Sequence, residues 1–186
     1  MGSLLYLIAR AFRAAKRIIL GKIATTYYRI VCREFGLGSH VAWGTWMSFP
    51  EKVRIGKNVY IGRDCLFSSE TASGYLTLED GVKINSDVLI DFSGGVLVKM
   101  DAFISEGVVV YSHTHGRDPR AEATWVKKEI GEKTWIGAQA IVMHSCEAIG
   151  RDSIIGVSSV VTKNVNARST VVGAAARTLT SMSDAG

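Results

Sequence analysis

The sequence predicts an all-β fold, a parallel β-helix of about six three-sided coils that follows an N-terminal α-helical segment. The first observation behind this prediction is that Ile-Gly pairs recur in couples six residues apart, as in Ile55-Gly56 and Ile61-Gly62. Extending this interval gives triplets of apolar residues: Leu37, Trp43, Phe49; Ile55, Ile61, Phe67; Leu78, Ile84, Ile90; Val98, Ile104, Val110; Ile130, Ile136, Val142; Ile149, Ile155, Val161. A period this short indicates a solenoid whose coils are stable only when stacked.

The second observation is where the extra residues fall. The step between triplets is 6 at first (49 to 55) and then 11, 8, 20 and 7, so every insertion follows the third member of a triplet. A prism with one strand on each of its three sides produces this pattern when all insertions leave at a single edge.

Residues 1–36 form a separate basic segment with seven Arg or Lys residues and one Glu, whereas the rest of the chain has 15 basic and 16 acidic residues. Residues 3–34 are predicted to be helical, with Gly21 breaking or bending the segment into two helices. One face is apolar, and Arg10, Arg13, Lys16 and Arg17 gather on the other. Such a helix binds an anionic membrane surface, or it packs on its own domain or a neighbouring subunit. Both interpretations are open at this point.

The run "IGEKTWIGAQAIVMHSCEAIGRDSIIGVSSVVTKNV" and the later "VVGAAARTL" resemble the C-terminal coils and tail of the hexapeptide-repeat acyltransferases. The resemblance covers residues 37–179, with 180–186 as a tail, and it is greatest to sugar O-acetyltransferases of the galactoside and maltose type. It implies a left-handed β-helix, a homotrimer with active sites between subunits, and acetyl-CoA as cosubstrate. The expected reaction is acetyl transfer to a hydroxyl of a sugar or glycan precursor in polysaccharide biosynthesis.

The largest insertion begins at "SHTHGRD", and the resemblance implies that a histidine at its base is the general base. Imidazole suits this role because its pKa lies near neutrality. His113 is nine and His115 eleven residues after Ile104, and the family register favours His115, with His113 orienting it or binding substrate. A zinc site like that of the γ-type carbonic anhydrases needs three histidines including an HxxxxH pair, which this sequence lacks. No metal is therefore expected.

The resemblance also implies the binding residues. Trp135, Ala138 and Val157 are expected along the pantetheine arm of coenzyme A, and Lys163 and Arg177 at its phosphates. Ala175 departs from the family tail, where proline is usual. Asn85 and Asp91 are expected to bind acceptor hydroxyls.

The sequence also leaves other functions open and excludes one. An N-acetyltransferase of an amino sugar and a non-catalytic β-helix scaffold are the alternative functions. Nucleic-acid binding is not expected, because the basic residues lie on one amphipathic helix while the remainder is near neutral. Three widely spaced cysteines without a CxxC pair indicate a reducing compartment, so the expected location is the cytoplasm, at the inner face of the membrane if the basic helix binds lipid.

Overall fold

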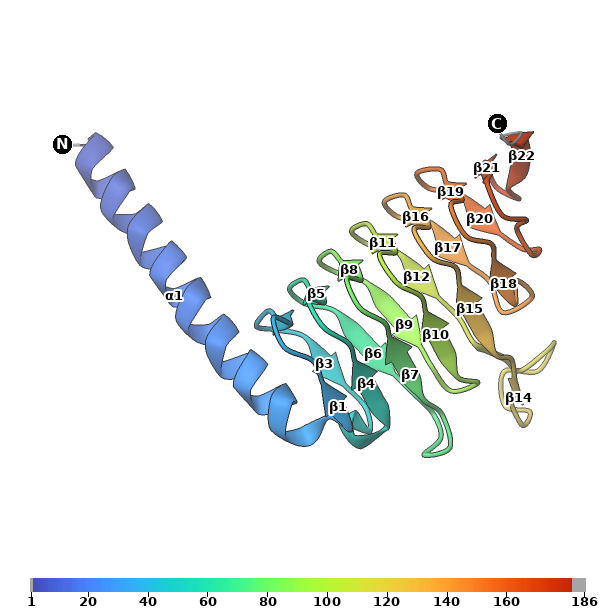
Figure 1. The fold of residues 1–186 in the computed structure, drawn as a ribbon, viewed down its shortest axis with the longest axis horizontal. Helices are drawn as coiled ribbons and strands as arrows, with labels where there is room; N and C mark the ends of the chain where they lie inside the picture. Colours follow the sequence, from blue (N-terminus) through green and yellow to red (C-terminus); the bar gives the residue numbers. More distant parts are fainter. Residues whose placement is uncertain (1, 182–186) are drawn as a thin grey trace.

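The computed structural model describes residues 2–181, which form a left-handed parallel β-helix preceded by one long helix, α1 (Gly2–Val31). Figure 1 shows the coils stacked side by side, with α1 running away from the first coil. Among the described residues, no helix combines the length and the apolar character needed to cross a bilayer.

Three sheets form the sides of the prism. The first contains β1 (Glu34–Phe35), β4 (Val53–Ile55), β7 (Leu76–Leu78), β10 (Val96–Val98), β15 (Lys128–Ile130) and β18 (Ala148–Ile149). The second contains β2 (His40–Val41), β5 (Tyr60–Ile61), β8 (Lys83–Ile84), β11 (Phe103–Ile104), β16 (Trp135–Ile136), β19 (Ile154–Ile155), β21 (Ser169–Val172) and β22 (Arg177–Ser181). The third contains β3 (Trp46–Met47), β6 (Leu66–Ser68), β9 (Leu89–Asp91), β12 (Val109–Val110), β17 (Ile141–Val142) and β20 (Val160–Val161).

The strands of each sheet pair in parallel, except that β22 turns back antiparallel to β21. Six coils are complete. A seventh consists of β21 and two isolated bridges, Ile149 to Val165 and Val160 to Ala174. The prediction of about six coils is confirmed, with this partial coil in addition. Residue 1 and residues 182–186, and with them most of the expected tail, lie outside the described residues.

The predicted triplets are confirmed from Ile55 onward, since members of neighbouring triplets pair across the coils and their side chains are buried. The prediction for the first coil is wrong. Leu37 is 81% exposed and Trp43 50% exposed, whereas Phe35, Val41 and Met47 hold the inward register. The short 3-10 helix η1 (Pro50–Lys52) is the cause, because it adds two residues between the first and second coils. The first coil thus begins at residue 34 rather than 37.

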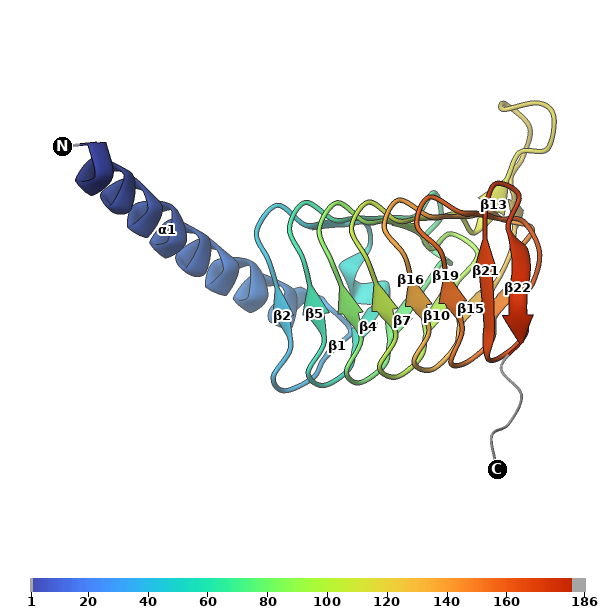
Figure 2. The same ribbon diagram turned by 90° about the horizontal axis from the view of Figure 1, so that it is seen from above.

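All the insertions leave the prism at one edge, between the third and first sheets, as the spacing predicts. The largest, residues 111–127, carries a two-stranded hairpin of β13 (His113–Thr114) and β14 (Thr124–Trp125). Figure 2 shows this insertion projecting well beyond the coils. We call this edge the insertion edge.

The other corners require tight turns, and several residues there adopt left-handed backbone conformations. Asn58, Asp64 and Asp87 have φ near +60°, which short polar side chains tolerate better than most others. Gly81 has φ +74°, and a Cβ atom there would lie 2.2 Å from a carboxylate oxygen of Asp101. The corner turns therefore explain part of the chain's glycine, aspartate and asparagine content.

Helix α1 is continuous, and the predicted break at Gly21 is wrong. Gly21 is buried instead, because the ring of His40 approaches so closely that a Cβ atom would lie 3.1 Å from it. The C-terminal half of α1 covers the first coil, with Ala24 and Tyr28 buried and the Tyr28 hydroxyl donating a hydrogen bond to the Thr45 carbonyl (2.8 Å). This contact closes the open end of the solenoid, where an uncovered sheet edge invites pairing with other chains.

Candidate active site

The candidate active site lies on the insertion edge, where three successive coils bring ionisable side chains together. Glu70 follows β6, Asp91 ends β9, and His113 begins β13 after β12. Because these strands belong to successive coils of one sheet, residues far apart in sequence become neighbours along the edge. His115 joins them from the far end of β13.

Asp91 is buried, and its two carboxylate oxygens accept five hydrogen bonds. Oδ1 accepts from the backbone N–H and the hydroxyl of Ser93, and Oδ2 accepts from the backbone N–H and hydroxyl of Ser112 and from Nδ1 of His113 at 2.7 Å. Burial by itself raises the pKa of Asp91, but the hydrogen bonds from Ser93, His113 and Ser112 outweigh it and hold the pKa below its usual value. Asp91 is therefore an ionised acceptor that fixes the orientation of His113.

This contact also fixes the tautomer of His113. An ionised carboxylate only accepts hydrogen bonds, so Nδ1 carries the proton and the lone pair of Nε2 points away from Asp91. Trp125, which pairs with His113 across the hairpin, tilts against the imidazole with 6.0 Å between ring centroids. His113 is thus held by a buried carboxylate on one side and an aromatic ring on another.

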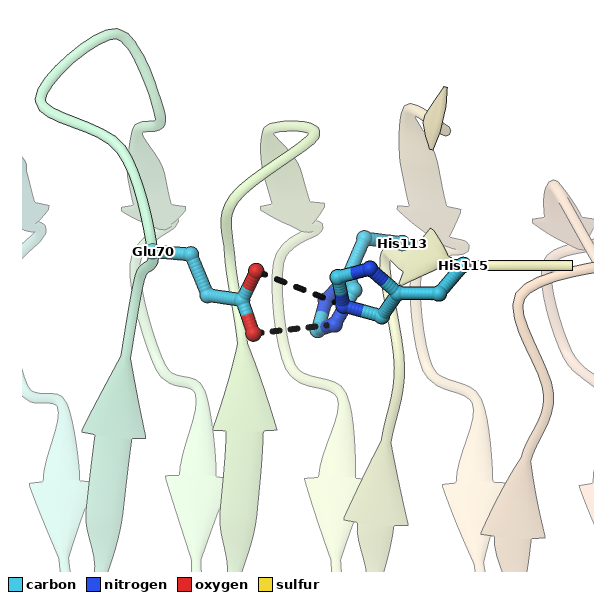
Figure 3. A group of neighbouring side chains, drawn as sticks. All are labelled: Glu70, His113 and His115. Carbon is cyan, nitrogen blue, oxygen red and sulfur yellow. Dashed lines mark ion pairs between the residues drawn. The ribbon is translucent and has the colours of Figure 1, made fainter. Parts of the chain in front are cut away.

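His115 is oriented by a different partner. Its Nδ1 donates a hydrogen bond to the carbonyl oxygen of Ala121 (2.8 Å), so its Nε2 also presents a lone pair. The two imidazoles are nearly perpendicular, with centroids 5.2 Å apart. Figure 3 shows the carboxylate of Glu70 reaching both rings, with Oε1 3.3 Å from Nε2 of His113 and Oε2 3.6 Å from Nε2 of His115.

The structure places the expected acceptor ligands on two different edges of the prism. Asp91 lies beneath His113, and all its hydrogen-bonding capacity is taken up by the five donors. Asn85 lies at the edge between the second and third sheets, where its amide donates a weak hydrogen bond to Glu106 (3.4 Å). The two residues therefore lie on different edges of the prism, and their binding of acceptor hydroxyls stays a prediction.

The expected pantetheine residues share the edge of Asn85. Ala138 and Val157 stand one coil apart there, joined by a hydrogen bond from the Ser158 N–H to the Ala138 carbonyl (2.9 Å). Trp135, on the neighbouring strand β16, is half exposed and donates from its indole nitrogen to the Ser105 hydroxyl (3.0 Å). These residues and the histidines therefore lie on different edges of the prism formed by one chain.

Lys163 and Arg177, which are predicted to meet the phosphates of coenzyme A, lie close to one another. Both line a hollow of about 350 Å³ near the C-terminal end of the solenoid. Arg177 is exposed and donates hydrogen bonds to the carbonyls of Ala175 and Ala176. The basic hollow is therefore present although Ala175 stands where the family tail usually has proline.

Three residues around the histidines had not been predicted from the sequence: Glu70, Ser93 and Ser112. Ser93 connects two insertions, since its hydroxyl donates to Asp91 and accepts the backbone N–H of Glu70 (2.9 Å). Glu70 carried a usable signal, because it lies in the second-largest insertion and all insertions leave at one edge. The serines carried none, since a serine in a turn is common in any sequence.

Lys128 is another residue that the sequence did not single out. Its ammonium group is buried below the insertion edge and donates to the carbonyls of Met143 (2.8 Å), His144 (2.6 Å) and Cys146. Burial lowers its pKa from the ordinary 10.5 to about 8. All three ammonium protons have acceptors, so Lys128 fixes the turn that follows β17.

No family model matches the sequence. Among solved structures, the chain is similar to a variant of AntD, an N-acyltransferase from Bacillus cereus in complex with dTDP and coenzyme A. The TM-score is 0.76 at 19% identity, with 85% of this chain and 89% of that chain covered.

Two further structures share the fold over a smaller part of their length. They are PerB from Caulobacter crescentus in complex with coenzyme A and GDP-perosamine (TM-score 0.59, 18% identity) and the acetyltransferase domain of PglB from Neisseria gonorrhoeae (TM-score 0.58, 19% identity). In both, 76% of this chain and 57% of the other are covered. At these identities the likeness establishes the left-handed β-helix fold, and the function is argued from the site.

Proposed function

We propose that the protein transfers an acyl group, in the first instance acetyl, from acyl-CoA to a sugar. The observation that carries the proposal is the Asp91–His113 pair, a buried carboxylate that orients an imidazole whose Nε2 faces the half-exposed Glu70 on the insertion edge. Such a pair is suited to general base catalysis because the carboxylate stabilises the imidazolium that forms. The fold and the coenzyme A complexes of AntD and PerB support the choice of donor.

His113, rather than His115, is the base in this proposal. Both rings present Nε2, but only His113 has an anionic partner at Nδ1, whereas the partner of His115 is a neutral carbonyl group. His113 accepts the proton of the acceptor as the acceptor atom forms a bond to the thioester carbonyl carbon. When the carbon–sulfur bond breaks, the imidazolium returns that proton to the departing thiolate.

Turnover of single variants tests this assignment. His113→Ala should lower kcat by about 10²- to 10⁴-fold, the range for loss of a general base, and His115→Ala should lower it less. Both variants should keep the melting temperature of the wild type within a few degrees. The opposite order of the two effects on kcat would return the role to His115, as the family register predicts.

The atom that accepts the acyl group is either a hydroxyl oxygen or an amino nitrogen. The resemblance to galactoside and maltose acetyltransferases favours a hydroxyl. The similar structures favour the amino group of a nucleotide-linked amino sugar, since AntD is an N-acyltransferase and PerB was solved in complex with GDP-perosamine. Hydroxylamine separates them, since it cleaves an ester product and leaves an amide intact. An acceptor screen with labelled acetyl-CoA, followed by hydroxylamine treatment, identifies the bond formed.

We also propose a homotrimer with the active site between subunits. Two features support it: residues 116–122 of the large insertion are exposed, apart from the chain's own coils, and the histidines and the pantetheine residues lie on different edges. Mixing inactive His113→Ala subunits with subunits altered at Trp135 tests the arrangement. Activity should return only after the two variants are unfolded and refolded together. Mixed trimers then form, and some of their sites combine an intact His113 from one subunit with an intact Trp135 from another.

The N-terminal half of α1 supports a location at an anionic membrane surface. Its apolar side chains are mostly more than half exposed, among them Leu4, Leu5, Ile8 and Phe12. On the opposite face, four basic residues of the helix line a hollow of about 560 Å³ together with Trp43, Arg63 and Asp64. Apolar contact with lipid and basic contact with headgroups together give stable binding. The proposed location is the cytoplasmic face of the membrane.

A further inference from the structure

We propose that Glu70, His113 and His115 form a binding site for a divalent transition-metal ion, Zn²⁺ in particular, and that an ion bound there inhibits acyl transfer. The sequence argued against a metal because two histidines alone leave the ligand set one short. The structure supplies the third ligand from an insertion two coils away. Only the inhibitory part rests on the proposed function, because binding of the ion does not require it.

Two distances between ligand atoms, each to a different oxygen of Glu70, are close to those around a tetrahedral ion. Zinc bonds of about 2.0–2.1 Å place neighbouring ligand atoms about 3.4 Å apart. The two Glu70 oxygens lie 3.3 and 3.6 Å from the Nε2 atoms of His113 and His115, and one set of ligand atoms from the three residues lies within 4.8 Å of one another. Direct hydrogen bonds between such groups are shorter, about 2.9 Å.

The outer contacts of both histidines also suit metal ligands. A histidine that binds a metal almost always donates its other ring N–H to a carboxylate or a backbone carbonyl, which fixes the tautomer and raises the basicity of the ligating nitrogen. His113 makes this contact with Asp91 and His115 with the carbonyl of Ala121. Each Nε2 therefore offers its lone pair to the same small volume beside Glu70 (Figure 3).

The types of ligand atom favour some metal ions over others, and the exposed side chains let an ion enter the site from solvent. Two imidazoles and one carboxylate favour zinc and similar transition ions over Mg²⁺ and Ca²⁺, which prefer oxygen ligands. The side chains of Glu70 and His115 are 50% and 29% exposed, so an ion can enter from solvent. Three protein ligands leave a fourth position for water.

Inhibition follows from which atoms the ion occupies. The lone pair of His113 Nε2 is the one that accepts the acceptor's proton in the proposed reaction. An ion coordinated there removes this base and fills the space where the acceptor would bind. Zinc should therefore compete with the acceptor, and a chelator should restore turnover.

Calorimetry on the full-length, chelator-treated protein with ZnCl₂ and without substrates tests binding by itself. We expect one ion per chain. Glu70→Gln and His115→Ala should each weaken the affinity at least 10-fold, and Asp91→Asn should weaken it by about 10- to 100-fold, the usual effect of losing an outer-shell partner. Glu122→Gln, an exposed carboxylate of the same insertion, and His144→Ala, a histidine outside the cluster, are matched controls that should bind as the wild type does.

Equal zinc affinity in the wild type, Glu70→Gln and His115→Ala would overturn the site. If zinc binds with the expected pattern among the variants but leaves turnover unchanged or raises it, the inhibition is refuted and the binding site stands. A protein without acyltransferase activity on any acceptor would refute the proposed function, yet calorimetry would still decide whether zinc binds at these three residues.

Discussion

The stacked coils and the elements that project from them follow different rules. Inside the coils, one apolar residue at every sixth position is buried against its equivalents in the coils above and below, so the interior is a repeat of one contact. The insertion edge and the N-terminal half of α1 have no such period and are largely exposed. The coils therefore determine stability, while the projecting parts hold the candidate site and the candidate membrane surface. Four predictions test this division, in order of decreasing effect on the free energy of unfolding.

The largest effect is expected in the interior. Phe67 is fully buried in β6 between Met47 and Ile90 of the neighbouring coils. Phe67→Ala should lower the free energy of unfolding by about 3–5 kcal/mol because it removes apolar contacts and leaves a cavity. Leu66→Ala, in the same strand but facing outward with 38% exposure, is the matched control and should cost about 1 kcal/mol or less. Urea denaturation at a fixed protein concentration measures both, and equal losses would contradict the inward register.

A smaller effect is expected at Lys128, beneath the insertion edge. Lys128→Met keeps the length of the side chain but leaves the carbonyls of Met143, His144 and Cys146 without their donor. The loss should be about 2 kcal/mol, because a buried group without a hydrogen-bond partner retains its full desolvation cost. Lys127→Met, its neighbour in sequence, is the control. A Lys128→Met protein as stable as the wild type would show that the turn after β17 does not need the ammonium group.

The pH dependence of stability gives a second test of Lys128. Its pKa is about 8 in the folded protein and near 10.5 when unfolded, so between these values the unfolded chain binds more protons. The free energy of unfolding should therefore rise with pH across this window in the wild type relative to Lys128→Met. Below pH 8 both states are protonated, and the difference should be constant. A difference that falls between pH 8 and 10 would contradict the lowered pKa.

The smallest effect on stability is expected at the exposed half of α1. Deletion of residues 2–20 should change the free energy of unfolding by less than about 0.5 kcal/mol, since the side chains of residues 4–19 are exposed. The deletion should nonetheless abolish sedimentation with phosphatidylglycerol vesicles. In the full-length chain, Phe12→Glu should weaken vesicle binding, and Thr26→Glu, an equal charge change on the packed half, should not.

A result in which Phe12→Glu and Thr26→Glu bind vesicles equally well would contradict the membrane surface. Loss of the trimer on deletion of residues 2–20 would instead identify this half of α1 as an interface between subunits. Measuring the molar mass of the deletion variant in solution distinguishes a retained trimer from a lost one.

The sequence by itself determined the coils, because a buried position that recurs every six residues leaves one solution, and it located the edge where all insertions leave. It also found both histidines. It misplaced the first coil, since Leu37, Trp43 and Phe49 continue the apolar period by chance while η1 shifts the true register by two residues.

Only the tertiary structure decided what surrounds the histidines. Glu70, Asp91 and His113 are separated by about 20 residues each, and stacking brings them together because each coil returns the chain to the same edge. The family resemblance implied Asp91 as an acceptor ligand, and the HxH spacing gave the histidines as a pair without a third ligand. Contacts between coils assign Asp91 to orienting His113 and add Glu70, and no spacing within one coil contains that information.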